Sequence, residues 1–204
     1  MGIWRGSLTG TNNKKLEDST RWQLCRLAVE HPEILDARLV HIPSWRTDAN
    51  VSEVGGIAPP MEMDNFQRYV AVVDVDGNAW SSRFAALLCM DSVVLKVQPT
   101  MVDYFHFQLH PWVHYIPVNA NLSDLIPNIQ WVLKNPNQTR EIVQNAHGWC
   151  SHQMVKESLA KDVLTIWDSY VRNLDIGNRG WISSWKVERD RIFQNINEMV
   201  PVSY

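Results

Sequence analysis

The stretch "YVAVVDVDGNAWSSRFAALL", residues 69 to 88, decides how this chain folds. Its first seven residues, 69 to 75, are too apolar to alternate and too few for a typical helix, so they predict a strand buried on both faces. After the turn Asp76-Gly77-Asn78, apolar residues recur at helical spacing over 84 to 88, which predicts a helix. The stretch is therefore one strand-turn-helix unit of an α/β fold with a parallel sheet.

The start of this helix has the features of a phosphate site. Ser81 or Ser82 is available as N-cap, and Arg83 falls in the first turn. An arginine there is repelled by the positive end of the helix dipole. A phosphate, in contrast, would be attracted by the dipole, by the free N–H groups and by the guanidinium. The alternative is an ordinary Asp-Gly turn whose serines only cap, with Arg83 extending to solvent. The sequence contains neither the G-x-G-x-x-G nor the P-loop pattern, so both interpretations stay open.

Strands and helices alternate along most of the chain. We expect strands at residues 3–7, 37–42, 92–97 and 114–118, and helices at 18–31, 102–109, 122–134, 138–152 and 155–173. A long surface loop is expected at 43–65. This alternation predicts an α/β fold with a Rossmann-like, doubly wound parallel sheet, which binds ligands at the carboxyl ends of its strands. Ser7, residues 78–83 and the turn at 96–101 would lie at those ends.

Composition indicates a folded globular protein. The 204 residues are 45% hydrophobic and 20% charged, which fits one large or two small domains. A formal charge of -3 without a Lys or Arg run argues against a nucleic-acid partner. No apolar stretch reaches the length of a membrane span, and no signal-peptide region follows Met1, so the chain as written would stay where it is made. Sequons at Asn50, Asn121 and Asn137 indicate either a secretory protein or chance in an Asn-rich chain.

Three cysteines, Cys25, Cys89 and Cys150, lie far apart in the sequence without a C-x-x-C motif. This spacing supports neither a zinc site nor a redox motif. Cys25 and Cys89 fall on apolar helix faces, where we expect buried thiols. Among ten tryptophans, Trp131 and Trp167 lie at helical spacing with aliphatic residues and are expected in the core.

Three histidines, His106, His110 and His114, are spaced by four, the interval that stacks metal ligands on one helix face. Pro111 breaks that helix, so we prefer packing and hydrogen-bonding roles for them to a zinc site.

Three carboxylates lie near the proposed ligand edge and could serve as a base: Asp74, Asp76 and Asp103. A turn-shaping role fits Asp76 better, and a helix cap fits Asp103 better.

Four motifs carry a resemblance to a known family. They are "WRGSLTG" (4–10), "VDVDGNAWSSRF" (73–84), "SVVLKV" (92–97) and "YFHFQLHPWVHYIPVNANLSDL" (104–125), in this order. Over roughly residues 3–175 the chain resembles glycosyltransferase family 90. That family includes capsule-associated fungal xylosyltransferases and KDEL-bearing protein O-glucosyltransferases.

The resemblance implies the donor half of a GT-B enzyme. Residues 1–175 would form a Rossmann-like domain that binds a UDP-sugar without a metal or other cofactor, and residues 176–204 a helical or disordered tail. The amino-terminal half of such an enzyme holds the protein or glycan acceptor and an aspartate base. By motif, the residues that would contact the UDP-sugar are Arg5 beside the pyrophosphate, Ser7, Asn78, Ala79, Trp80, Ser81, Ser82 and Arg83. Trp80 would pack against the sugar or the nucleotide base of the UDP-sugar.

The function implied is inverting, metal-independent transfer of glucose or xylose from a UDP-sugar to a hydroxyl. For the full-length protein the resemblance implies the secretory pathway, in the lumen of the endoplasmic reticulum or Golgi. Nothing precedes Met1, so we expect the catalytic aspartate upstream of this chain and its identity is unknown. The alternatives are a non-catalytic UDP-sugar-binding fragment and a structural α/β interaction module.

Overall fold

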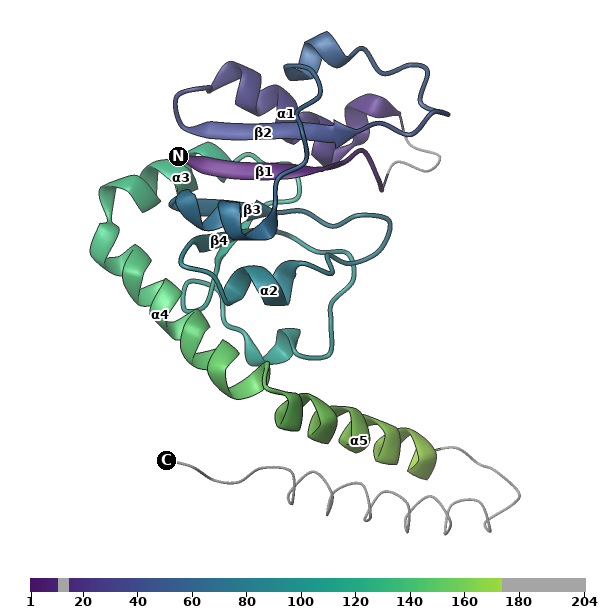
Figure 1. Cartoon of the computed structure of the whole chain (residues 1–204), viewed down its shortest axis with the longest axis vertical. Coiled ribbons are helices and arrows are strands. Elements are labelled where there is room, and N and C mark those ends of the chain that lie inside the picture. Colours follow the sequence, from purple (N-terminus) through teal and green to yellow (C-terminus); the bar gives the residue numbers. More distant parts are fainter. Residues whose placement is uncertain (11–14, 174–204) are drawn as a thin grey trace. The chain divides into compact units, whose positions relative to one another are not determined.

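The structure is a computed structural model that describes residues 1–10 and 15–173 (Figure 1). Its contacts divide the chain into two units, Met1–Cys150 and Ser151–Tyr204, each described by itself. The expected domain boundary at residue 175 lies outside the described residues. The elements are β1 Gly2–Ser7, η1 Leu16–Asp18, α1 Thr20–Glu30, β2 Leu35–His41, η2 Val51–Val54, η3 Met63–Arg68, β3 Ala71–Asp74, α2 Phe84–Leu88, β4 Val93–Val97, η4 His106–Gln108, β5 Ile116–Val118, α3 Leu125–Lys134, α4 Pro136–Gln153 and α5 Lys156–Asn173.

Five strands form one sheet in the order β2-β1-β3-β4-β5, and every neighbouring pair is parallel (Figure 1). The chain steps from β1 to β2 on one side and then to β3 on the other side of β1, so the strand order reverses between β1 and β3. The doubly wound parallel sheet is confirmed. In such sheets the crevice at the reversal point, outside the carboxyl ends of the strands, is where ligands bind.

Helices cover both faces of the sheet. On one face, a single buried cluster joins Leu95 of β4 to Cys25 of α1 and Ile129 of α3. Lys96 follows Leu95 and points to the opposite face, because strand residues alternate. Its Nζ lies 5.0 Å from the ring centre of Phe84, which places α2 on that second face. The strands are buried on both sides, which explains why β3 and β4 are apolar apart from Asp74 and Lys96, which pair with each other.

One predicted helix and one predicted loop differ from the observed elements. The segment 102–109 forms only a 3-10 turn, η4, at His106–Gln108. Phe105, just before it, packs in an aromatic cluster against Phe84 and Trp149, whereas Phe107 is 80% exposed. The expected loop at 43–65 contains η2 and the start of η3.

The expectation of a buried thiol at Cys89 is wrong. Cys89 is exposed at the end of α2 and forms a disulfide with Cys150 of α4, across a sequence separation of 61. Sequence spacing could not show this pair, because the two helices meet only in the fold. Cys25 is free and buried, as expected, and burial raises the pKa of its thiol to about 12.

In the second unit, α5 buries Leu164 and Val171, which lie seven residues apart on one face. The expectation that Trp167 belongs to the core is wrong, since 42% of this residue is exposed. Its ring centre lies 5.8 Å from that of Tyr170, which is also exposed. Among the described residues, none of the helices combines the length and apolarity that a membrane span requires.

Candidate donor-binding crevice

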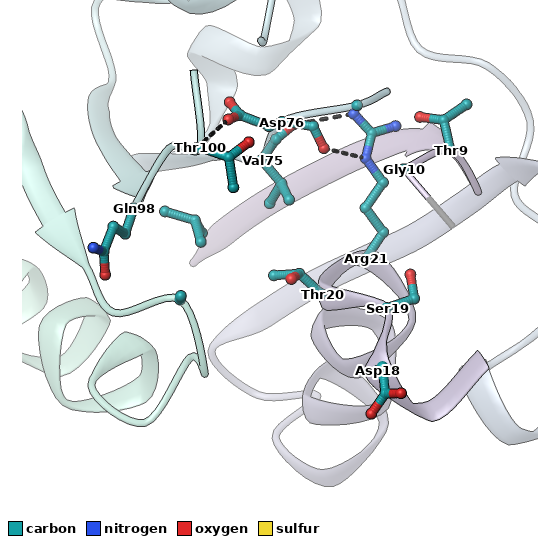
Figure 2. Close-up of a pocket in the computed structure, with 13 residues that line it drawn as sticks. Thr9, Gly10, Asp18, Ser19, Thr20, Arg21, Val75, Asp76, Gln98 and Thr100 are labelled. Atoms are coloured by element: carbon teal, nitrogen blue, oxygen red, sulfur yellow. Dashed lines mark hydrogen bonds between the residues drawn. The ribbon is translucent and has the colours of Figure 1, made fainter. Parts of the chain in front are cut away.

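A crevice of about 210 Å³ opens between the carboxyl ends of β1 and β3, where the strand order reverses (Figure 2). It brings together the loops after β1, β3, β4 and β5 and the start of α1. Its lining residues are Thr9, Gly10, Asp18, Ser19, Thr20, Arg21, Val75, Asp76, Gly77, Val97, Gln98, Thr100 and Ala120. Hydroxyl, amide and carboxylate groups predominate, which suits a polar ligand rich in hydrogen-bonding groups.

The first turn of α1 forms one wall of the crevice. Ser19 is the N-cap, and its hydroxyl accepts a hydrogen bond from the backbone N–H of Trp22. The backbone N–H groups of Thr20 and Arg21 belong to the first turn, which has no intrahelical acceptors for them. Since α1 is 11 residues long, its dipole also places partial positive charge at this wall. An anion in the crevice would be stabilised there.

Arg21 holds the ends of β1 and β3 together beside the crevice (Figure 2). Its guanidinium donates to three backbone carbonyls: from Nη1 to Ser7 at 2.7 Å, from Nε to Asp76 at 3.0 Å and from Nη2 to Val75 at 3.0 Å. Burial, and then the positive charge of Arg83, lower the pKa of Arg21 to about 10. Arg21 is therefore still a cation at neutral pH, close to a second cation.

The loops after β1 and β3 touch at a glycine. The backbone N–H of Gly10 donates to Oδ1 of Asn78 at 2.8 Å. Gly10 has a φ of 74°, and a Cβ added to it would lie 2.5 Å from the carbonyl oxygen of Gly77. Only glycine allows both this backbone conformation and this close approach. Asn78, one of the predicted donor contacts, is thereby fixed at the edge of the crevice.

A buried charge network supports the crevice from the α2 side. Asp74 is 0% exposed, and its two oxygens accept hydrogen bonds from the Ser81 hydroxyl at 2.6 Å and from Lys96 Nζ at 2.9 Å. Lys96 also donates to Asp76 Oδ1 at 2.7 Å. The other Asp76 oxygen accepts from the backbone N–H of Thr100 at 3.1 Å. The network fixes the turn after β3 and the turn after β4 in one arrangement, and it confirms that Asp76 shapes its turn.

The helix start predicted around Ser81 is wrong. α2 begins at Phe84 and Arg83 is its N-cap residue, without a side-chain capping bond. Ser81 does not cap, because Asp74 holds its hydroxyl. Arg83 does not extend to solvent either. Its Nη1 donates to the carbonyl oxygen of Arg5 at 2.7 Å, its guanidinium lies 6.0 Å from the ring centre of Phe66, and burial lowers its pKa while Asp74 raises it.

The residues of the "WRGS" motif each have a structural role in β1. Trp4 is fully buried, and a Cβ at Gly6 would lie 2.6 Å from the Trp4 ring, so glycine makes room for the indole. Arg5, 9% exposed, donates from Nη2 to Asp36 Oδ2 at 2.6 Å across to β2. Ser7 ends β1, and its carbonyl oxygen accepts a hydrogen bond from Arg21. Direct contact of Arg5 or Ser7 with a donor stays a prediction.

The remaining predicted contacts lie in the turn before α2. Asn78 and Ser82 are exposed, Ala79 is half-buried and Trp80 is 52% exposed. Of the eight predicted residues, the structure places Asn78 beside the crevice by its bond to Gly10, and none of the eight is among the residues that line it. Whether the turn itself meets the ligand stays a prediction.

Sequence reasoning did not identify Arg21 and Lys96. The signal used for Arg83, an arginine in the first turn of a helix after a strand, is also present at Arg21, and Arg21 begins a longer helix. Lys96 carried a different signal, a lysine within an apolar strand. A buried lysine requires a paired carboxylate, which the structure provides twice.

The histidines and Asp103 lie outside this crevice. The His106 ring packs 5.6 Å from Phe84, and the backbone N–H of His110 donates to His114 Nδ1 at 3.0 Å, as the packing interpretation expected. Asp103 does not cap, because η4 has Phe105 as N-cap without a side-chain bond. Burial raises the pKa of Asp103, and burial together with the charge of Lys96 lowers that of His106.

With this geometry in place, comparison with known proteins identifies the family. The family model described as "Glycosyl transferase family 90" matches residues 1–180. The chain belongs to glycosyl transferase family 90. The match covers both loops that meet at Gly10 and Asn78 and the whole sheet.

Two named proteins are similar to this chain in sequence, and one solved structure shares its fold. The chain is 33% identical to human protein O-glucosyltransferase 3 over 124 residues, 61% of the chain and 24% of that protein. It is 32% identical to Danio rerio protein O-glucosyltransferase 2 over 141 residues, 69% of the chain and 26% of that protein. The chain therefore spans about a quarter of the length of these relatives. The C-terminal domain of a glycosyl transferase group 1 family protein from Francisella tularensis has the same fold, with a TM-score of 0.51, 11% identity, and coverage of 76% of this chain and 85% of that one.

Proposed function

We propose that this family 90 domain binds the UDP-sugar donor of a glycosyltransferase that transfers glucose, or alternatively xylose, to a hydroxyl of a protein or glycan acceptor. The crevice at the reversal point of the sheet carries this proposal. Its position is where doubly wound sheets bind ligands. The names of the relatives, protein O-glucosyltransferases, support glucose as the sugar and a protein as the acceptor.

The charges around the crevice suit a diphosphate. Arg21 and Arg83 are close enough that the charge of Arg83 lowers the pKa of Arg21, and a bound anion would relieve this repulsion. Asp74 and Asp76 share Lys96 and also lie near Arg21 and Arg83, so three cations offset two carboxylates beside the crevice and the carboxylates oppose a phosphate little. Asp18 is an exposed carboxylate on the lining, suited to accept from ribose or sugar hydroxyls.

Catalysis would follow from the same charges. When the donor bond breaks, negative charge develops on the leaving β-phosphate, and fixed N–H groups and a guanidinium stabilise that charge more in the transition state than in the ground state. The α1 amides and the two arginines would supply these groups, so the proposed reaction is metal-independent. Inversion would require a base on the opposite face of the sugar.

The secretory pathway is the proposed location. The disulfide between Cys89 and Cys150 is the type of bond that persists in oxidising compartments. Its two cysteines lie 61 positions apart, so it ties α2 to α4 within the first unit. The sequons are consistent with the same location.

Calorimetric titration of UDP into the chain in the presence of EDTA tests the proposal. We expect binding without added metal. Thr100→Trp would place a large side chain in the crevice and should lower the affinity for UDP by about tenfold or more, which corresponds to roughly 1.4 kcal/mol. Thr47→Trp, an exposed loop threonine outside the lining, is the matched control and should bind as the wild type does. A folded chain that binds no UDP, or equal losses in both variants, contradicts the proposal.

A second variant asks whether the turn before α2 contributes. If the Arg83 guanidinium contacts the pyrophosphate, Arg83→Ala should lose about 1.5–3 kcal/mol of binding free energy. Because Arg83 also donates to the Arg5 carbonyl, the melting temperature must be followed in parallel. Unchanged affinity in a folded Arg83→Ala protein would confine Arg83 to its structural role. Acceptor-dependent release of UDP from UDP-glucose and UDP-xylose then separates an enzyme from a binding module.

A further inference from the structure

We propose that Asn50 is an N-glycosylation site and that the sequon at Asn137 is not used. This inference rests on the secretory location within the proposed function. The three sequons, at Asn50, Asn121 and Asn137, look alike in sequence. The fold places their acceptor amides and hydroxyls in different surroundings.

The Asn50 sequon presents both of its required groups to solvent. Asn50 and Ser52 are exposed, between β2 and the short helix η2. The Asn50 Oδ1 accepts from the Ser52 hydroxyl at 2.8 Å and from the Ser52 backbone N–H at 3.3 Å. Both bonds use the amide oxygen, so within the described part of the chain the Nδ2 group of Asn50 donates to no protein atom. That nitrogen is the group that becomes glycosylated.

The Asn137 sequon lies in the first turn of α4, and its hydroxyl is out of reach. Thr139 is 5% exposed, and its Oγ1 donates to the carbonyl oxygen of Val132 at 3.2 Å. Its backbone N–H donates to Asn135 at 2.9 Å. A transferase that must recognise the hydroxyl of the third sequon residue cannot approach it in this helix.

The modification is a substitution at a sugar carbon. The co-reactant is a polyprenyl-diphosphate oligosaccharide. The Asn50 Nδ2 attacks C1 of its first sugar, the bond from C1 to the diphosphate oxygen breaks, and the polyprenyl diphosphate leaves with that electron pair. The new bond joins C1 to Nδ2, and the amide loses one proton.

A glycan on Asn50 leaves the donor crevice open. Val54 of η2 and the following Gly55 line a separate cavity together with Met1 and Leu35, at the amino ends of β1 and β2. The donor crevice is at the opposite, carboxyl ends of the strands. Asn121 differs in this respect, since it directly follows Ala120, which lines the donor crevice.

Secretion of the full chain behind a cleavable leader in insect cells, followed by peptide mapping before and after enzymatic removal of N-glycans, tests the proposal. We expect the Asn50 peptide to be glycosylated in most molecules and the Asn137 peptide in almost none. Asn50→Gln and Ser52→Ala should each abolish the signal at position 50. Asn137→Gln is the matched control and should leave it unchanged.

An unmodified Asn50 peptide, or an Asn137 peptide occupied as often as that of Asn50, overturns the inference. The wild-type peptides alone decide this, so a variant that fails to fold does not affect the outcome. UDP titration of the same purified glycoprotein keeps the two proposals apart. An unmodified Asn50 with normal UDP binding refutes only the glycosylation site, and an occupied Asn50 without UDP binding refutes only the donor-binding function.

Discussion

The backbone N–H of Gly10 donates to Oδ1 of Asn78 at 2.8 Å, and this bond joins two loops whose residues are 68 positions apart in the sequence. The loops follow β1 and β3, the two strands between which the sheet order reverses. The same contact brings Gly10 against the carbonyl of Gly77, which lines the crevice. The shape of the crevice therefore depends on the absence of a side chain at position 10.

Gly10→Ala tests this dependence. The added Cβ would meet the Gly77 oxygen at 2.5 Å in addition to the strain of a φ of 74°. Gly56→Ala is a matched control, because Gly56 has a φ of 79° with no atom within 4 Å of the added Cβ. We expect Gly56→Ala to lose about 1–2 kcal/mol of unfolding free energy from backbone strain alone, and Gly10→Ala roughly 1–3 kcal/mol more. Urea titrations measure both, and equal losses would show that the loop contact is not tight.

Lys96→Met should be among the most damaging single changes in the domain. It leaves Asp74, 0% exposed, with a buried charge and without its ion-pair partner. Breaking such a pair from one side costs about 3–5 kcal/mol. Ser81→Ala removes one hydrogen bond to the same carboxylate and should cost about 1–3 kcal/mol. Lys134→Met, at an exposed lysine in the last turn of α3, should stay within about 0.5 kcal/mol in the same urea titration.

The sheet could be predicted from the sequence because its signals are local. The central strands β3 and β4 are short, mainly apolar runs, and both lie within the predicted residues. The site could be predicted only to the edge of the sheet, since its bonds join distant residues: Arg21 to Asp76 across 55 positions and Arg83 to Arg5 across 78. A local pattern assigned Arg83 to a phosphate, whereas the fold also uses its guanidinium to hold the Arg5 carbonyl.

The buried thiol of Cys25 should make the domain less stable at alkaline pH. Burial raises its folded-state pKa to about 12, above the unfolded value near 8.5. The stabilisation is therefore fully present below about pH 8.5 and is lost as the pH rises toward 12. Relative to Cys25→Ala, the unfolding free energy of the wild type should fall by about 1–2 kcal/mol between pH 8 and 10. A difference between the two proteins that does not change with pH would mean that the thiol ionises equally in both states.

Removal of the disulfide should destabilise the first unit. The bond closes a long loop between α2 and α4, across a sequence separation of 61. A disulfide that closes such a loop typically raises the free energy of unfolding by about 2–4 kcal/mol. Cys89→Ser with Cys150→Ser should lose this amount in urea titrations and become insensitive to reducing agent. Cys25→Ser retains the disulfide, so its stability should still fall on reduction. Equal stability of oxidised and reduced wild type would contradict the prediction.

The last prediction concerns the base that sugar transfer needs. Asp74 and Asp76 lie at the carboxyl end of β3, but each carboxylate has both oxygens engaged, by Ser81 and Lys96 in one case and by Lys96 and Thr100 in the other. Neither is free to take a proton from an acceptor hydroxyl. Because general-base catalysis supplies about 10²–10⁴-fold, we expect the 204-residue chain to release UDP from UDP-glucose only by slow hydrolysis, with or without hydroxyl-bearing acceptor peptides.

The assay is UDP release by the wild type, Asp74→Asn, Asp18→Asn and Asp103→Asn, each with its urea titration. Asp74→Asn should lose stability, because the buried Lys96 charge keeps only one carboxylate partner. Asp18 and Asp103 do not belong to that network, so their variants should fold as the wild type does. Asp103→Asn should leave the slow rate unchanged, and Asp18→Asn, which alters a proposed donor contact, should leave it unchanged only at saturating UDP-glucose. Fast acceptor-dependent turnover that disappears in a stable Asp18→Asn or Asp103→Asn protein would identify a base within this domain and refute the expectation that the base lies outside it.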